Sequence, residues 1–324
     1  MTEQQQKVSR ADAGSFVAAP QGGAALEAEV LPGLLPAGAA PEGRRASLWS
    51  DAWRELRRNP IAIISSLFIL LVVLMAVVPG LFTRQDPRAC EITLSKLRPS
   101  GEHWFGTDNL GCDYFAQTIY GARASISVGV LVTLGTAILG ILIGAAAGYY
   151  GGIADALLSR ASDIVLGIPL VLGAIVILTV IRSRTIFTVA LVLMLLYWPT
   201  VVRIMRSTVI GTRNMDYVQA AKALGAGNLR VIRRHVLPNA IAPVIVVSTI
   251  NLGIFIAVEA TLSYLGVGLS RPAISWGLMI SDAQRLFRSF PHLLLFPGLF
   301  LSVTVLSFIL LGDAVRDALD PKLR

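Results

Sequence analysis

The sequence predicts an all-α polytopic membrane protein, and three observations support that fold class. Apolar residues make up 54% of the 324-residue chain, and only 15% of its residues are charged, whereas soluble domains are about one-quarter charged. The mean hydropathy is +0.68. The apolar residues also gather in long stretches without a charge. For most of the chain, this composition excludes disorder, a collagen-like repeat and a disulfide-dense secreted module.

Six apolar stretches are long enough to cross a membrane. A helix rises about 1.5 Å per residue, so about 20 apolar residues span the hydrocarbon core. The predicted spans are 61–82, 124–150, 164–181, 185–202, 240–258 and 291–312. Only three residues separate the third span from the fourth, which predicts a tight helical hairpin. The second span carries Gly140, Gly144 and Gly148, a spacing that lets another helix approach closely.

The distribution of basic residues predicts that both chain termini are cytoplasmic. With the N-terminus inside, the cytoplasmic segments hold 18 Lys and Arg residues and the outer segments hold 10. The segment 203–239 is the most asymmetric, with seven basic residues and one acid. Lys and Arg are enriched in cytoplasmic loops. The net charge of +8 is therefore explained without a nucleic-acid partner.

The segments before the first span differ from the rest of the chain. Residues 1–43 are rich in Ala, Gly, Pro and Gln without periodicity, which predicts a disordered cytoplasmic tail. Residues 44–60 contain a short amphipathic helix suited to the inner membrane interface. No apolar stretch follows a basic start, so we expect no signal peptide.

The two cysteines fall in one predicted extracytoplasmic loop, 83–123. An oxidising compartment would allow Cys90 and Cys112 to form a disulfide. Two free thiols are the alternative, and we favour the disulfide.

The segment 214–238, between the fourth and fifth spans, carries a helical pattern followed by a glycine break. Four residues fall on one helix face at positions i, i+3, i+4 and i+7: Tyr217, Ala220, Ala221 and Leu224. Gly225 is suited to end this helix because it adopts positive φ without penalty. Asn228 is a candidate cap for the next short helix, and Pro238 fits the first turn of the fifth span.

Two interpretations of this segment are open from physical chemistry alone. A basic amphipathic helix could rest on anionic lipid. The alternative is docking onto another protein, because the small alanines at the centre of the face permit close backbone approach. The glycine break also favours docking.

The same segment resembles the EAA loop of permease subunits in ATP-binding-cassette (ABC) importers. That pattern is Glu-Ala-Ala, three residues, Gly, nine residues and Ile-x-Leu-Pro. Two residues depart from it: Gln219 replaces the glutamate, and His235 stands where isoleucine is usual. The matching positions are Ala220, Ala221, Gly225, Leu237 and Pro238.

Three further segments are similar to the C-type permease of dipeptide, oligopeptide and nickel importers. They are HWFGTDNLGCDYFAQTIYGARASISVG (103–129), GYYGGIADALLSRASDIVLGIPLVL (148–172) and VEATLSYLGVGLSRPAISWGLMI (258–280). The resemblance covers roughly residues 45–324. It implies the type I ABC importer permease fold, with a core permease domain over 124–312 and a cytoplasmic C-terminus at 313–324.

The resemblance also implies a mechanism, partners and a location. The 214–238 loop would be a coupling helix that inserts into a groove of a cytoplasmic ATPase. The machine would comprise this chain, a homologous second permease, two ATPases and an extracytoplasmic solute-binding protein. It would lie in the bacterial cytoplasmic membrane and move solute by alternating access.

Motifs for catalysis are absent from the sequence. It contains no GxxxxGK[ST] loop, no HExxH, no GxSxG and no cysteine or histidine cluster at zinc spacing. We therefore expect a transport subunit without a catalytic site, metal or bound cofactor. ATP and Mg would bind the partner ATPases.

The predicted spans are nearly free of charged residues. Asn251 and Glu259, both near the fifth span, are candidates for the translocation path or an outer gate, and interhelical hydrogen bonding is the alternative. Asp163 is expected to cap the third span and Pro169 to kink it.

The favoured function is the permease subunit of a di- or oligopeptide importer. The same machine could instead carry nickel chelates or another small solute. A stand-alone secondary carrier or channel and a non-transporting membrane scaffold are the alternatives from other classes. The scarcity of charge within the spans argues against a stand-alone carrier.

Overall fold

The computed structural model describes residues 48–319, and within that range the chain is helical and contains no β-strand. Within these residues, five helices are long and apolar enough to cross a membrane, and a bent pair of helices makes a sixth candidate if the pair counts as one span. The prediction of an all-α membrane protein is confirmed, and the described residues hold five or six candidate spans where the sequence predicts six. The predicted tail, 1–43, lies outside the described residues.

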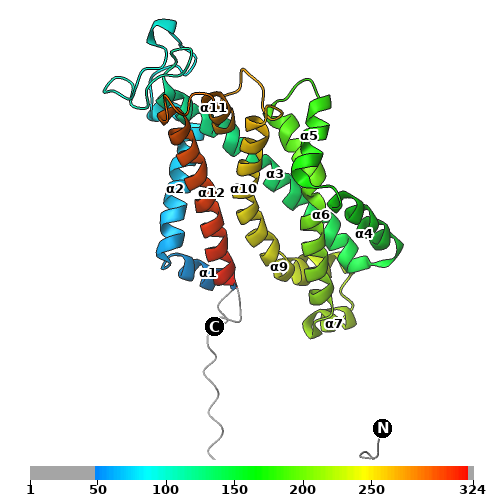
Figure 1. The fold of residues 1–324 in the computed structure, drawn as a ribbon. Coiled ribbons are helices and arrows are strands. Elements are labelled where there is room, and N and C mark those ends of the chain that lie inside the picture. Colours follow the sequence, from blue (N-terminus) through cyan, green and yellow to red (C-terminus); the bar gives the residue numbers. More distant parts are fainter. Residues whose placement is uncertain (1–47, 320–324) are drawn as a thin grey trace, which may run out of the picture. The chain divides into compact units, whose positions relative to one another are not determined.

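The first two helices form a corner at one end of the bundle (Figure 1). α1 (Leu48–Leu56) buries Ala52, whereas Trp53 is exposed and lies beneath the guanidinium of Arg57, with 4.6 Å between the Arg57 Cζ and the ring centroid. α2 (Pro60–Val77) begins at a cap in which the Asn59 side chain accepts hydrogen bonds from the first turn. A short 3₁₀ turn, Pro79–Leu81, follows α2. The regular helix of the first span therefore ends at Val77, five residues before the end of the predicted span, 61–82.

The second span is longer than predicted. α3 (Tyr114–Tyr150) begins ten residues before the predicted start at 124, so the outer loop ends at residue 113 rather than 123. Asp113 causes the early start, because its carboxylate accepts a 2.7 Å hydrogen bond from the backbone N–H of Ala116 and caps the helix. The loop itself contains one 3₁₀ turn, Ile92–Leu94.

The predicted third span, 164–181, is wrong as one straight helix. α4 (Gly152–Leu166) and α5 (Leu170–Val180) meet at 83° across a three-residue break. Pro169 stands immediately before α5, where its ring cannot continue a helix from α4. The expectation that Asp163 caps this span is wrong. It lies within α4, and its carboxylate accepts a 2.8 Å hydrogen bond from Arg203.

The remaining long helices complete the bundle, and short helices connect them. α6 (Ile186–Arg213) runs eleven residues past the predicted end at 202, and α12 (His292–Leu319) runs seven past 312. The fifth span, predicted at 240–258, is α10 (Ala242–Tyr264), which ends six residues later than predicted. The short helices are α7 (Asp216–Ala223), α8 (Asn228–Val231), a π-helical turn (Ile232–Val236), α9 (Leu237–Ala240) and α11 (Trp276–Ala283).

The bundle has two distinct ends (Figure 1). α7, α9 and α1 lie at one end, which we call the α7 end. The loop 83–113 and α11 lie at the other, which we call the α11 end. Apolar side chains form three clusters. One lies near α11, and one lies among α3, α5, α6 and α10. The third lies between α3, α6 and the connection from α6 to α10, residues 214–241, which we call the α7 segment.

Helices α3 and α6 pack through the predicted glycines. A Cβ on Gly140 would overlap the side chain of Val201, and a Cβ on Gly144 would lie 2.7 Å from the carbonyl oxygen of Val202. Such distances are shorter than real Cβ contacts, so only glycine allows this backbone approach.

Candidate functional site

The connection between α6 and α10 presents an exposed face at the α7 end. Tyr217, Ala220 and Leu224 are exposed there, with 90% of Leu224 accessible. Val218, on the opposite side of α7, is fully buried. A large apolar side chain that is almost wholly accessible, beside small alanines, fits a surface that another protein covers.

A glycine ends α7 in the way the sequence predicts. Gly225 has φ of +85°, which is left-handed backbone that other residues rarely adopt. Its N–H donates to the carbonyl oxygen of Lys222 at 2.9 Å, and the N–H of Ala226 donates to that of Ala221 at 3.1 Å. This pair of bonds is the Schellman motif. The motif turns the chain sharply from α7 into α8.

A side-chain hydrogen bond attaches α7 to the end of α6, and buried valines pack the inner side of the α7 segment. Gln219, which replaces the glutamate of the EAA pattern, donates from its Nε2 to the carbonyl oxygen of Arg213 at 3.0 Å. Val231 and Val236 are fully buried below the segment. The uncharged side-chain amide of Gln219 therefore attaches α7 to the end of α6.

The second half of the segment departs from two expectations. Asn228 is the first residue of α8, and Gly227 holds the cap position, so the predicted asparagine cap is wrong. Pro238 lies in the first turn of α9 rather than of the fifth span, and Leu237, also in α9, is partly buried. His235 belongs to the π-helical turn, with its ring centroid 6.5 Å from that of Tyr217.

The two polar candidates of the fifth span are both buried and hydrogen-bonded between helices. Glu259 is fully buried and accepts hydrogen bonds from Ser125 on α3 at 3.0 Å and from Ser263 at 2.7 Å. Asn251 accepts a 3.0 Å bond from the Tyr197 hydroxyl on α6. These contacts place both side chains between helices of this chain.

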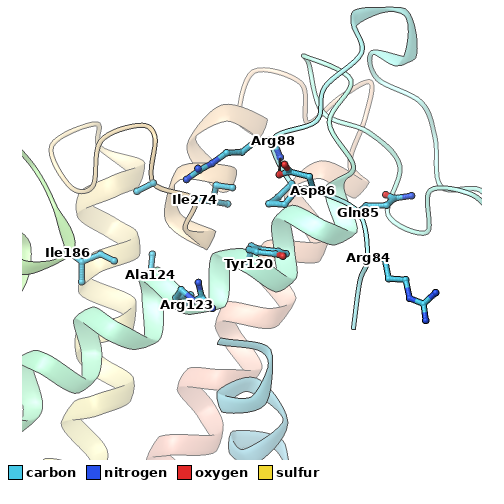
Figure 2. A pocket seen from close by; sticks show the side chains of 11 residues that line it. Arg84, Gln85, Asp86, Arg88, Tyr120, Arg123, Ala124, Ile186 and Ile274 are labelled. Carbon is cyan, nitrogen blue, oxygen red and sulfur yellow. Dashed lines mark hydrogen bonds between the residues drawn. The ribbon is translucent and has the colours of Figure 1, made fainter. Parts of the chain in front are cut away.

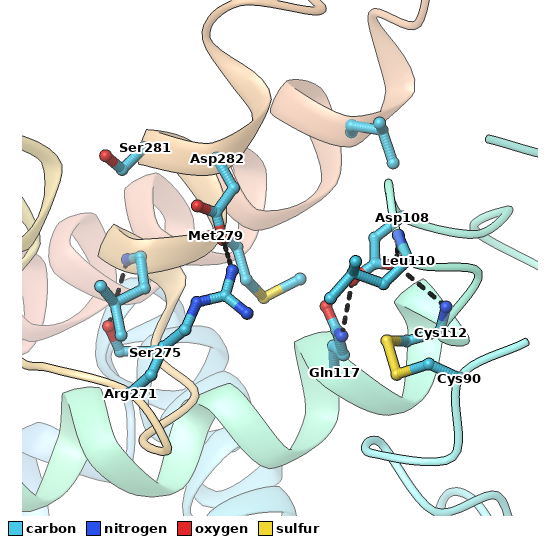
Figure 3. Close-up of polar contacts among 12 residues, drawn as sticks. Cys90, Asp108, Leu110, Cys112, Gln117, Arg271, Ser275, Met279, Ser281 and Asp282 are labelled. Carbon is cyan, nitrogen blue, oxygen red and sulfur yellow. Dashed lines mark hydrogen bonds and ion pairs between the residues drawn. A yellow bond between two sulfur atoms is a disulfide. The ribbon is translucent and has the colours of Figure 1, made fainter. Parts of the chain in front are cut away.

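A disulfide joins Cys90 and Cys112 in the loop at the α11 end (Figure 3). Beside it, Asp108 accepts hydrogen bonds from the backbone N–H of Cys112 at 2.9 Å and from Gln117 of α3 at 2.9 Å. His103 contacts the helix-capping Asp113 at 2.8 Å. The loop is thus attached to the start of α3 by a covalent bond and several polar contacts.

An exposed ion pair joins α11 to the residues that precede it, also at the α11 end of the bundle (Figure 3). Arg271 donates to Asp282 at 2.6 Å. Desolvation raises the pKa of the Asp282 carboxyl, and the charge of Arg271 opposes that increase. Both residues line a cavity of about 320 Å³ with Asp108 and Tyr114.

A larger cavity of about 560 Å³ lies where α3 meets the residues that follow α2 (Figure 2). Arg88 reaches across it and donates to the carbonyl oxygen of Pro272 at 3.3 Å. Arg123 donates to the carbonyl oxygens of Ala76 and Val77 at the end of α2, at 2.9 and 3.3 Å.

Within residues 48–319, no group of three or more His, Cys, Asp and Glu side chains could hold a metal ion.

Residues of other helices support the α7 segment, and the sequence does not predict them. Arg213 donates to the carbonyl oxygens of Gly148 and Tyr149 at 2.8 and 3.0 Å. The Tyr149 hydroxyl donates to Asn228 at 3.1 Å. These contacts join positions 64 to 79 residues apart, so no local pattern signals them.

A bundle of membrane-length helices with an exposed, glycine-terminated connection at one end defines a multi-pass membrane protein. The family described as the binding-protein-dependent transport system inner membrane component matches residues 140–324. The N-terminal TM domain of oligopeptide transport permease C matches residues 47–98. The chain therefore belongs to the family of binding-protein-dependent transport permeases, as the sequence resemblance predicts.

Three curated relatives match over most of their length. The oligopeptide transport system permease protein OppC of Bacillus subtilis is 37% identical over 278 residues, covering 86% of this chain and 91% of the relative. The dipeptide transport system permease protein DppC of Alkalihalophilus pseudofirmus is 38% identical with the same coverage. The glutathione transport system permease protein GsiD of Pectobacterium atrosepticum is 32% identical, covering 85% of this chain and 92% of the relative.

Proposed function

We propose that this chain is a permease subunit of an ATP-driven importer of di- or oligopeptides. The main structural support for an ATPase-coupled mechanism is the α7 segment. It exposes Tyr217, Ala220 and Leu224, while Val218 on the opposite side of α7 is buried. The names of the OppC and DppC relatives support peptides as the solute class. The other components would be a homologous second permease, two ATPases and an external solute-binding protein.

The α7 end faces the cytoplasm in this proposal. The concentration of Lys and Arg in residues 203–239 supports that orientation, because basic residues are retained on the cytoplasmic side. The disulfide between Cys90 and Cys112 then lies on the external side, where oxidation is possible. The membrane would be the bacterial inner membrane, in agreement with the family description.

The exposed face of α7 is proposed to dock into a groove on an ATPase. Its alanines allow a close approach of the two backbones, and Tyr217 and Leu224 supply the area to be buried. Gly225 fixes the direction in which α7 projects. ATP and Mg would bind the ATPases, and their movement would shift α7 and alternate the access of the solute path.

Asn251 and Glu259 are proposed to support the path rather than line it. Each is at most 4% exposed and bonds a different neighbouring helix. A buried polar group that loses its partner costs about 1–3 kcal/mol. These two side chains would therefore hold α10 against α3 and α6 while the subunits move.

The test is purification of the complex from native membranes through a tag on the C-terminus, followed by reconstitution into vesicles. We expect two P-loop ATPases and a second permease to co-purify, and peptide uptake to require ATP and the binding protein. An ATPase variant without its catalytic base serves as the control. Uptake by this chain alone, without ATPases, would establish a stand-alone carrier and refute the proposal.

The solute class is tested in the same vesicles. Dipeptides and longer peptides are compared with nickel chelates, each with the associated binding protein. Saturable uptake of peptides and no uptake of nickel chelates is expected. Uptake of nickel chelates alone would show that the transport mechanism is right and the solute class wrong.

A further inference from the structure

Tyr149, at the end of α3, contacts both halves of the α7 segment. Its side chain is 8% exposed. Its hydroxyl donates to Oδ1 of Asn228, in α8, at 3.1 Å. The Nζ of Lys222, in α7, lies 5.0 Å from the centre of its ring, within the range of a cation–π interaction. One side chain of α3 therefore joins the two helices that flank the Gly225 turn.

The backbone at the same point is held by a second residue. Arg213 donates from one nitrogen to the carbonyl oxygens of Gly148 and Tyr149. The last carbonyls of a helix lack partners within the helix, and a cation there is favourable. The carbonyl oxygen of Arg213 accepts the side-chain amide of Gln219. A continuous chain of hydrogen bonds thus runs from α7 through the end of α6 to the end of α3.

Apolar packing joins the same elements. Tyr149 belongs to one buried cluster with Val209 of α6, Val218 of α7 and Val231 of α8. A Cβ on Gly148 would lie 2.8 Å from the carbonyl oxygen of Arg206. Close-packed contacts of this kind transmit displacement between elements, because cores do not deform continuously.

The connection from the α7 segment to α10 is less regular. The chain passes through the π-helical turn Ile232–Val236 and the four-residue α9, and α10 starts only after Ile241. A π-helical turn is frequently found at a functional site, and a π-bulge is one of the places where a helix bends. A displacement of α7 would be carried directly to α3 and α6 and partly absorbed before α10.

We propose that Tyr149 is a positioning residue that transmits the movement of α7 to α3 through its hydroxyl bond to Asn228. This role rests on the proposed function, since it requires an ATPase to move α7. The residue lies outside the EAA-type segment, and it acts through Asn228 rather than by touching the solute or the ATPase.

The experiment measures solute transported per ATP hydrolysed by the complete complex in vesicles. Tyr149→Phe removes only the hydroxyl and keeps the ring against Lys222. Tyr150→Phe is the matched control, because Tyr150 is the next residue, is 63% exposed and contacts the ring of Tyr149 edge to face. Asn228→Ala removes the acceptor, and Asn228→Asp keeps it.

Transport per ATP is expected to fall about fivefold in Tyr149→Phe and Asn228→Ala, as for one lost hydrogen bond of about 1 kcal/mol. The double variant should be no worse than either single variant, because both remove the same interaction. Asn228→Asp and Tyr150→Phe should match the wild type. Basal ATPase activity and subunit stoichiometry should be unchanged in Tyr149→Phe and Tyr150→Phe, which a merely structural defect would not produce.

Two results overturn this role for Tyr149. One is wild-type transport per ATP in Tyr149→Phe, and the other is additive losses in the double variant. A wild-type complex whose uptake needs no ATPase would instead refute the proposed function. The two failures are therefore distinguished by the wild-type measurement.

Discussion

Ser125 on α3 donates a 3.0 Å hydrogen bond to the fully buried carboxylate of Glu259 on α10, 134 residues away. Ser263 donates to the other carboxylate oxygen at 2.7 Å. The Ser263 hydroxyl in turn accepts the backbone N–H of Leu269 at 3.0 Å. The carboxylate is thus the centre of a polar contact that joins two spans and the chain leaving α10.

Replacement of Glu259 by leucine is expected to destabilise the protein by about 1–3 kcal/mol, because both serine hydroxyls lose their buried acceptor. Glu259→Gln keeps one acceptor oxygen and should have a smaller effect. The thermal unfolding midpoint of the detergent-solubilised protein measures both. The interpretation is contradicted if leucine is tolerated as well as glutamine.

Substitution of Gly144 tests the close packing of α3 on α6. Gly144→Val places side-chain atoms where even a Cβ would be 2.7 Å from the Val202 carbonyl oxygen, so we expect loss of most folded protein. Gly211→Ala, at a position of α6 with nothing within 4 Å of the added Cβ, is the control. Size-exclusion chromatography in detergent gives the yield of monodisperse protein. Equal yields for the two variants would contradict the packing role.

Gly225 isolates the effect of backbone conformation on coupling. A Cβ at Gly225 would meet nothing within 4 Å, and the same is true at Gly227, but only Gly225 has positive φ, at +85°. An L-residue in left-handed backbone costs about 1–2 kcal/mol. Gly225→Val should leave the spans folded and reduce ATP-driven uptake at least tenfold.

Gly227→Ala should keep uptake near the wild-type value, since φ of −64° suits any residue. Uptake in reconstituted vesicles is compared at equal amounts of assembled complex. Full activity of Gly225→Val would show that the direction of α7 does not matter for coupling.

The disulfide is tested by chemistry and by stability. The intact protein should show no alkylated thiols without reductant and two after reduction, because Cys90 and Cys112 are joined. A covalent bond that closes a loop of this length contributes about 3 kcal/mol in the loop-entropy model. The Cys90→Ser, Cys112→Ser double variant should therefore expose residues 83–113 to faster proteolysis. Alkylation of both cysteines before reduction would exclude the bond in the purified protein.

The fold class, the approximate spans and the position of the α7 segment could all be predicted from the sequence. These features are local: a membrane span is a continuous apolar run, and a helix end is marked by one glycine such as Gly225. Their physical causes lie within a few residues of one another, so a pattern along the chain contains them.

The way in which those elements are divided and joined depends on the packing of the whole chain. The tertiary structure broke the predicted third span at 167–169 and started α3 at Tyr114, where Asp113 caps it. It also brought Ser125 to Glu259 and Tyr149 to Asn228. These partners are far apart in the chain, and their meeting depends on how α3 packs against α6 and α10, which no periodicity along a single segment specifies.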